Sequence, residues 1–198
     1  MQQFTITLLR HGETVTPKNL NGATDVALSA RGKQQMLEAV SKLRDIDCVV
    51  TSPLQRCCMI AKTIASQWQV PLSIENQIAE MNFGDWDGQP FDELYRQFPS
   101  QMDEFWHTPW HVTVPNGEQL NDFYQRIDGA WQHQLIRHKN TLMVCHGGVI
   151  RYLIAKVLNL DSHNNRHITA LKIDFAAVVK IQITVDNNKY YPMLLWPS

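Results

Sequence analysis

Short apolar runs alternate along the chain with longer segments that carry apolar residues on one face. The apolar runs have the length and composition of buried β-strands and cover residues 4–9, 46–51, 71–74 and 141–145. The amphipathic segments have the period of α-helices and cover residues 29–44, 53–68, 117–137 and 148–158. Strands that alternate with helices predict a three-layer α/β/α fold, in which helices cover both faces of a mostly parallel sheet.

Residues at the ends of these segments support the assignments. Ser29 can cap the first helix, and Ser52 can cap the second, with Pro53 in its first turn. The stretch 76–115 is aromatic and irregular, with short helices expected near 92–98 and 102–106. Residues 178–185 and 189–196 flank an Asp-Asn-Asn turn and predict a terminal hairpin, which gives the sheet an antiparallel edge.

Length and composition limit the classes of protein that this chain can belong to. Its 198 residues, 44% of them hydrophobic, predict a single domain over residues 1–198. A net charge of −1 argues against nucleic acid or an anionic membrane as a partner. No apolar run approaches the roughly 20 residues that cross a bilayer. The four cysteines form no C-x-x-C pair and the first residues lack a secretory pattern, so a cytoplasmic location is expected.

Polar residues follow three of the predicted strands directly. Arg10 and His11 come after the first strand, Thr51 and Ser52 end the second, and His146 follows the strand 141–145. Because ligands of open α/β sheets bind beyond the carboxyl ends of the strands, we expect these side chains to form one site.

Arg10 and His11 have a chemistry that suits phosphate esters. A neutral histidine is a capable nucleophile near pH 7, and an arginine offers a planar, permanently charged fork to phosphate oxygens. Gly12 allows the backbone to turn sharply beside a bound anion. An ordinary loop with a solvated arginine would explain the same residues.

Five segments together resemble the motifs of the histidine phosphatase superfamily, in the order in which that family carries them. They are L-L-R-H-G-E-T at 8–14, T-S-P-L-Q-R at 51–56, E-M-N-F-G-D-W-D-G at 80–88, P-N-G-E at 115–118 and C-H-G-G-V-I-R at 145–151. The resemblance spans most of the chain and implies the phosphoglycerate-mutase-like fold.

The resemblance also implies a role for each of five catalytic residues. His11 would attack phosphorus and become a phosphohistidine, which water then hydrolyses. Arg10, Arg56 and a protonated or donating His146 would surround the oxygens of the phosphoryl group. Glu80 would protonate the leaving oxygen and later accept a proton from water. Since side chains supply the positive charge, neither a metal nor another cofactor is expected.

The residues expected to bind substrate are less closely tied to the motifs. The predicted set is Asn21, Gly22, Gly147, Trp106 and Trp110, the tryptophans acting as a lid over an organic leaving group. Pro17 stands where relatives usually have an asparagine, so either Asn19 or Asn21 could take the role of that residue.

Each of these residues also has an ordinary structural explanation. Arg56 could be solvated on its helix, Glu80 could be a loop carboxylate, and His146 could be a strand-end histidine. Arg151 is expected to pair with a carboxylate. The histidine pairs at 107 and 111 and at 163 and 167 have the spacing of metal ligands, but Pro109 interrupts the first pair and the second lacks a third ligand.

The short length favours a phosphatase over a phosphoglycerate mutase, because mutases of this fold carry extra segments. The aromatic segments are most similar to those of bacterial α-ribazole phosphatases, which remove a 5′-phosphate during assembly of the cobalamin nucleotide loop. The expected partner is therefore a small phosphomonoester. A broad-specificity phosphatase, a mutase and a non-catalytic phosphate-binding relative remain alternatives. The terminal hairpin could also pair with a second chain in a homodimer.

Overall fold

The computed structural model describes residues 1–160 and 166–196, which form one mixed sheet flanked by helices. The strands are β1 (Gln2–Arg10), β2 (Cys48–Thr51), β3 (Leu72–Ile74), β4 (Thr141–Cys145), β5 (Val178–Asp186) and β6 (Lys189–Leu195). The helices are α1 (Ala30–Ser41), α2 (Gln55–Trp68), α3 (Phe91–Gln97), α4 (Pro99–His107), α5 (Leu120–Arg137), α6 (Gly147–Val157) and α7 (Arg166–Ala170). Two 3₁₀ turns, η1 (Asn76–Ile78) and η2 (Gly84–Trp86), lie between β3 and α3.

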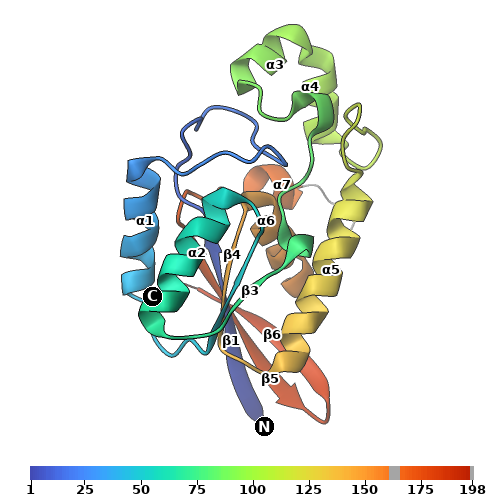
Figure 1. Cartoon of the computed structure of the whole chain (residues 1–198). Helices are drawn as coiled ribbons and strands as arrows, with labels where there is room; N and C mark the ends of the chain where they lie inside the picture. The colour runs from blue at the N-terminus through green and yellow to red at the C-terminus, as the bar shows by residue number, and fades with distance from the viewer. Residues whose placement is uncertain (161–165, 197–198) are drawn as a thin grey trace.

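The six described strands follow the order β3-β2-β4-β1-β5-β6. β1, β2, β3 and β4 run parallel, whereas β5 and β6 are antiparallel additions at one edge. Figure 1 shows α1 and α2 on one side of the sheet, α5 and α6 on the other, and α3 and α4 beyond its carboxyl end. The predicted three-layer α/β/α fold with an antiparallel edge is confirmed.

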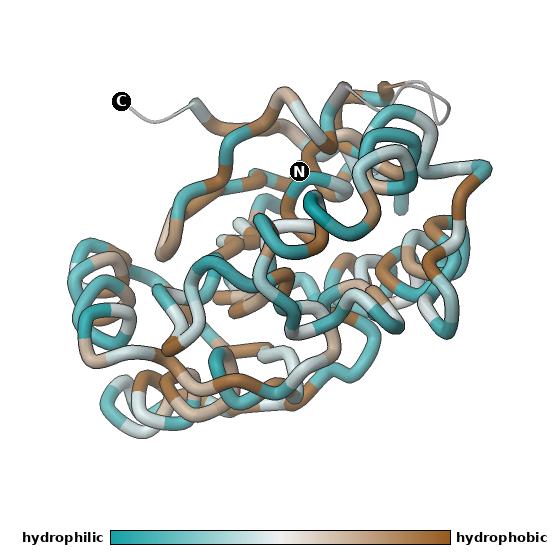
Figure 2. Tube along the Cα trace, turned by 90° about the horizontal axis from the view of Figure 1, so that it is seen from above, coloured by the Kyte–Doolittle hydropathy of each residue, from teal (hydrophilic) through white to brown (hydrophobic). Residues whose placement is uncertain are grey.

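The two faces of the sheet carry separate hydrophobic cores. Successive side chains of a strand point to opposite faces, so Leu8 packs with the α5–α6 layer and Leu9 with the α1–α2 layer. Met143 and Val144 of β4 divide in the same way. Figure 2 shows hydrophilic and hydrophobic residues mixed along the helices, as expected of amphipathic helices that cover a sheet.

The start of α2 differs from the prediction. Ser29 caps α1 as expected, with its side chain accepting a hydrogen bond from the amide of Gly32. Ser52, however, does not cap α2, because the helix begins three residues later, at Gln55. The carboxylate of Asp25 accepts from the amide of Gln55 at 2.7 Å instead. Ser52 is therefore available for another partner.

The remaining elements lie near their predicted positions. The hairpin is present as β5 and β6, and the two short helices of the aromatic stretch are α3 and α4. Helix α5 starts at Leu120 rather than at residue 117, because the amide of Glu118 donates to the carbonyl of Asn82. Within residues 1–160 and 166–196, no helix is both long enough and apolar enough to span a membrane.

Candidate active site

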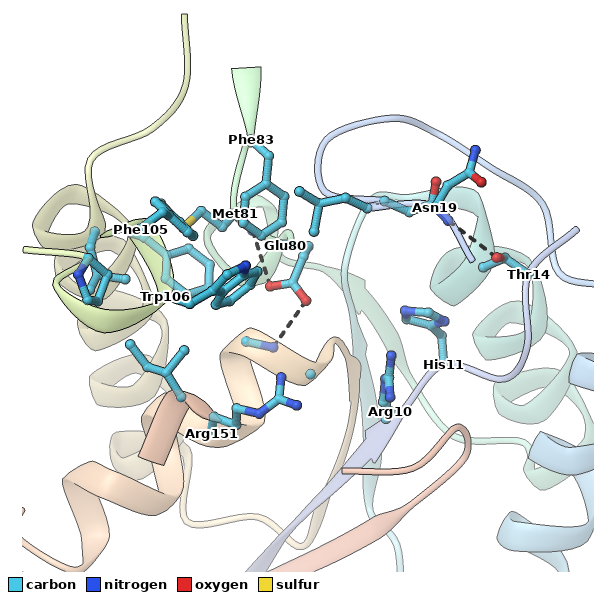
Figure 3. A pocket seen from close by; sticks show the side chains of 18 of the residues that line it. Arg10, His11, Thr14, Asn19, Glu80, Met81, Phe83, Phe105, Trp106 and Arg151 are labelled. Carbon is cyan, nitrogen blue, oxygen red and sulfur yellow. Dashed lines mark hydrogen bonds between the residues drawn. The ribbon is translucent and has the colours of Figure 1, made fainter. Parts of the chain in front are cut away.

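A cavity of about 200 Å³ opens beside the carboxyl end of β1 (Figure 3). Six of the predicted site residues line it: Arg10, His11, Asn21, Glu80, Trp106 and Gly147. The other four do not: Gly22, Arg56, Trp110 and His146. The lining thus joins residues of β1, the loop before η2, α4 and the start of α6.

His11 is held as a neutral imidazole with a defined tautomer. Its Nδ1 lies 2.8 Å from the carbonyl oxygen of Gly12, and a carbonyl can only accept, so Nδ1 carries the proton. Nε2 is therefore the nitrogen with the free electron pair. Burial, together with the positive charge of Arg56, lowers the pKa of His11 to about 3. His11 consequently has the form that a nucleophile needs across the neutral range.

Arg10 supplies positive charge to the floor of the cavity. One end of its guanidinium donates to the carbonyl of Ile173, and the group lies over the ring of Phe175, 4.4 Å from the centroid. Its Nε is buried without a hydrogen-bond partner among the described residues. Burial lowers the pKa of Arg10, although the nearby Glu80 opposes that shift. This Nε–H group can therefore donate a hydrogen bond to a bound anion.

His146 and Arg56 lie beside His11 but away from the cavity wall. The rings of His11 and His146 are 5.2 Å apart, and the Nε of Arg56 donates to Nδ1 of His146 at 3.3 Å. Since Nδ1 accepts, the proton of neutral His146 is on Nε2, which donates to Oγ of Ser52 at 2.7 Å. Burial is the main cause that lowers the pKa of His146. Of the two forms that the sequence left open, protonated or donating, the structure shows a neutral ring that donates through Nε2.

Glu80 reaches the cavity from the opposite side. Its carboxylate accepts from the amide of Gly148 at 3.1 Å and from the amide of Met81 at 3.2 Å. Arg126 of α5 fixes the loop behind it, by donating to the carbonyl of Glu80 and pairing with Glu118. Figure 3 shows the carboxylate above the start of α6, in the same cavity as His11.

Some of the residues predicted to bind substrate line the cavity and others do not. Asn21 and Asn19 both line the cavity, and Asn21 donates to the hydroxyl of Thr14 at 3.4 Å. Gly22 is buried below the lining, where its carbonyl accepts from Arg56. Trp110 belongs to a neighbouring cavity and packs edge-on against Tyr124, because α4 ends at His107 and Trp110 lies beyond it.

Some contributors to the site were not among the predicted site residues, although two of them lie inside the motif segments. Arg151 lines the cavity and donates to the carbonyl of Leu171, and among residues 1–160 and 166–196 it forms no ion pair with the carboxylate that was expected. Phe175 forms another part of the lining. Asp87 lies inside the E-M-N-F-G-D-W-D-G segment, and its carboxylate accepts from the amides of residues 22–24. Of the two histidine pairs, His163 lies outside the described residues, and the described part of the chain contains no cluster of three metal-binding side chains.

The lowered pKa of His11 predicts a loss of stability in acid. Between pH 6.5 and about 3 an unfolded chain binds a proton that folded His11 does not, so the free energy of unfolding falls as the pH falls through that range. His11→Gln removes the contribution. The free energy of unfolding in urea is measured at pH 7 and at pH 4.5. We expect the decrease between the two pH values to be about 2 kcal/mol smaller in this variant than in the parent. Equal differences in both proteins would contradict the lowered pKa.

Known proteins match this chain over four fifths of its length or more. The sequence pattern of the histidine phosphatase superfamily (branch 1) covers residues 6–191. The adenosylcobalamin/alpha-ribazole phosphatase of Escherichia coli (strain K12) is 30% identical over 167 residues, which are 81% of this chain and 82% of that protein. A 2,3-bisphosphoglycerate-dependent phosphoglycerate mutase of Bartonella henselae is 30% identical over 171 residues, 80% of this chain and 83% of that one. The crystal structure of the alpha-ribazole phosphatase from Shigella flexneri superposes with a TM-score of 0.78 at 26% identity, covering 97% of this chain and 96% of that one.

Proposed function

Since this chain belongs to the histidine phosphatase superfamily, we propose that it hydrolyses small phosphomonoesters through a phosphohistidine formed on His11. The observation that carries the proposal is the tautomer of His11, whose Nδ1 is bound to the carbonyl of Gly12 while Nε2 keeps its electron pair. A nucleophile that is neutral at pH 7 and lines a cavity beside Arg10 suits attack on a phosphate ester.

The proposed reaction has two displacements at phosphorus. In the first, Nε2 of His11 forms a bond to phosphorus, the ester P–O bond breaks, and the acid form of Glu80 gives its proton to the leaving oxygen. In the second, water attacks phosphorus, its proton passes to Glu80, and the P–N bond breaks to release phosphate. Arg10 and Arg56 would supply positive charge near the phosphoryl oxygens, where negative charge resides in the transition state.

We propose α-ribazole 5′-phosphate as the substrate, with the phosphate beside His11 and the benzimidazole against the aromatic side of the cavity. Aromatic side chains dominate that side: Phe83, Phe105, Trp106, Phe123 and Tyr124. A flat, hydrophobic leaving group can stack on such a surface. The likeness to proteins named as alpha-ribazole phosphatases supports the same choice.

Turnover of α-ribazole 5′-phosphate, 3-phosphoglycerate and phenyl phosphate, measured side by side, tests the substrate. We expect the largest kcat/KM with α-ribazole 5′-phosphate. Comparable values for all three esters would identify a broad-specificity phosphatase and overturn this choice. No turnover of any ester would favour a non-catalytic phosphate-binding protein.

A phosphotransferase is the second candidate, favoured by the likeness to the Bartonella mutase. A mutase would pass the phosphoryl group from the histidine back to a phosphoglycerate rather than to water. Added 2,3-bisphosphoglycerate would then stimulate exchange between 2- and 3-phosphoglycerate. We expect release of inorganic phosphate without such exchange.

Glu80→Gln should slow poor leaving groups most. The amide of glutamine has no acidic proton, and an alkoxide needs protonation far more than a nitrophenolate does. We expect kcat to fall by about 10² or more for alkyl phosphates, and by much less for 4-nitrophenyl phosphate. Steady-state assays of both esters measure the ratio, and an equal loss for both would contradict the role of Glu80 as a proton donor.

Gly148→Ala should impair catalysis while the fold is kept. A methyl group at this position would lie 2.4 Å from Oε1 of Glu80, at the mobile end of a side chain that can move away. A displacement of about 1 Å in a catalytic group can cost roughly 100-fold in rate. The matched control is Gly129→Ala in α5, where the added methyl meets no atom within 4 Å. Full activity of Gly148→Ala would show that the position of Glu80 is unimportant.

A further inference from the structure

Arg56 is a fully buried cation without a carboxylate beside it. It is 0% exposed, and within residues 1–160 and 166–196 it forms no ion pair. Its Nη1 donates to the carbonyl of Thr24 at 2.8 Å, and its Nη2 donates to the carbonyls of Asn21 and Gly22 at 3.2 and 2.5 Å. A buried charge with only neutral partners is costly, so compensation is expected nearby.

Asp87 lies on the other side of the same loop. Its Oδ1 accepts from the amides of Gly22 and Thr24 at 3.1 and 2.9 Å. Its Oδ2 accepts from the amides of Ala23 and Phe83 at 2.7 and 3.0 Å. One carboxylate therefore receives four backbone hydrogen bonds, three of them from the loop that holds Arg56.

Two peptide units connect the two charges directly. The unit between Asn21 and Gly22 has its carbonyl on Arg56 and its N–H on Asp87, and the unit between Gly22 and Ala23 is bound in the same way. In each unit the peptide dipole has its negative end toward the guanidinium and its positive end toward the carboxylate. Hydrogen bonds arranged in such chains polarise and strengthen one another.

We propose that Asp87 is a positioning residue for the phosphatase reaction, which sets the orientation of Arg56 through these two peptide units. The inference rests on the proposed function, because Arg56 matters here as a phosphoryl-binding group. Four N–H groups of Arg56 are occupied by His146 and the three carbonyls, which leaves one N–H on Nη1 without a described partner. Three carbonyls of the loop fix the guanidinium in place, and Asp87 holds the amides of the same loop.

The geometry of the loop supports this reading. A methyl group at Gly22 would lie 2.4 Å from Oδ2 of Asp87 and 2.1 Å from the carbonyl of Met81, so only glycine permits the close approach. Asp87 also holds the amide of Phe83, whose side chain lines the aromatic side of the cavity (Figure 3). The same carboxylate thus links the loop around Arg56 to the leaving-group side.

Asp87→Asn tests the proposal, with Asp85→Asn as the matched control. Asparagine has one acceptor oxygen, and its NH₂ would face two backbone N–H groups. Asp85 is two residues away and exposed, and it accepts from the side chain of Asn116. We expect Asp87→Asn to lower kcat/KM for 4-nitrophenyl phosphate by about 10- to 100-fold, as loss of a residue that orients a ligand typically does. The inhibition constant of inorganic phosphate should rise in parallel, and Asp85→Asn should resemble the parent protein.

A double-mutant cycle that combines Asp87→Asn with Arg56→Lys separates an effect on the orientation of Arg56 from a general loss of structure. Lysine has a single nitrogen in place of Nε, Nη1 and Nη2, so it cannot reproduce the fork that joins His146 to the loop carbonyls, and Asp87→Asn should change phosphate inhibition by less than about 3-fold in that background. Equal losses in both backgrounds would overturn the proposal, as would a lowered Tm with unchanged kinetics. If Asp87→Asn does not fold, Asp87→Glu keeps the charge, and its smaller kinetic loss must also vanish in Arg56→Lys. Absence of turnover in the parent protein would instead refute the proposed function.

Discussion

His11→Ala should abolish phosphatase turnover and the phosphorylated enzyme together. Alanine has no nitrogen that can form the P–N bond, so only uncatalysed attack by bound water would remain. Loss of a nucleophile of this kind costs at least about 10³-fold in kcat. The measurement is a radiolabelled phosphate ester, quenched during turnover, with the label followed in acid and in base. In the parent protein the label should be labile in acid and stable in base, as expected of a phosphohistidine.

His133→Ala is the control for this experiment. His133 is on the exposed face of α5, with 66% of its side chain accessible, and it does not line the cavity. Its variant should be labelled and turn over like the parent. If His11→Ala were still labelled, another residue would be the nucleophile. Circular dichroism and urea unfolding at pH 7 would show whether the variant is folded when the activity is lost.

Arg56→Ala should have the second largest effect, on stability and on activity. The substitution leaves three backbone carbonyls and Nδ1 of His146 without their donor, and it removes the positive charge at one end of the two peptide units that Asp87 holds at the other. Each buried acceptor left without its donor costs about 1–3 kcal/mol, so the loss of all four contacts is expected to cost about 3–5 kcal/mol. We therefore expect the free energy of unfolding in urea to fall by about that amount.

The activity of Arg56→Ala, measured below its unfolding temperature, should fall by at least about 100-fold, because the proposed charge-assisted contact to the phosphoryl group would be lost. Arg31→Ala is the control, since 76% of the Arg31 side chain is exposed. It should change stability by less than about 0.5 kcal/mol and leave turnover unchanged. A stable and active Arg56→Ala would refute both the structural and the chemical role.

The layout of the fold could be predicted from local patterns because buried strands and amphipathic helices differ in their periods. Polar residues that follow strands directly indicated the edge at which Arg10 and His11 lie. Their predicted position depends only on where β1 ends. The residue types themselves indicated chemistry with phosphate.

Features set by contacts between distant residues could not be predicted in this way. Ser52 has the sequence context of a helix cap, but a hydrogen bond to His146, 94 residues later, determines its role. Trp110 is four residues from Trp106, as on one helix face, but α4 ends between them. The loop of residues 21–24 that surrounds Arg56 is bound to Asp87, and no local pattern shows that segments 65 residues apart meet.

The position of β1 at the centre of the sheet has a consequence for folding during synthesis. β1 pairs with β4 and β5, so Leu9 lies opposite Val144 on one side and Val178 on the other. The chain segment that carries His11 leaves the ribosome early, but its neighbours follow more than 130 residues later. Contacts between such distant segments form slowly. The ring of His11 packs against His146, which directly follows β4, and Phe175, which comes shortly before β5, so its surroundings form only when these late segments dock on β1. Nascent chains that end before residue 146 should therefore lack the proposed activity.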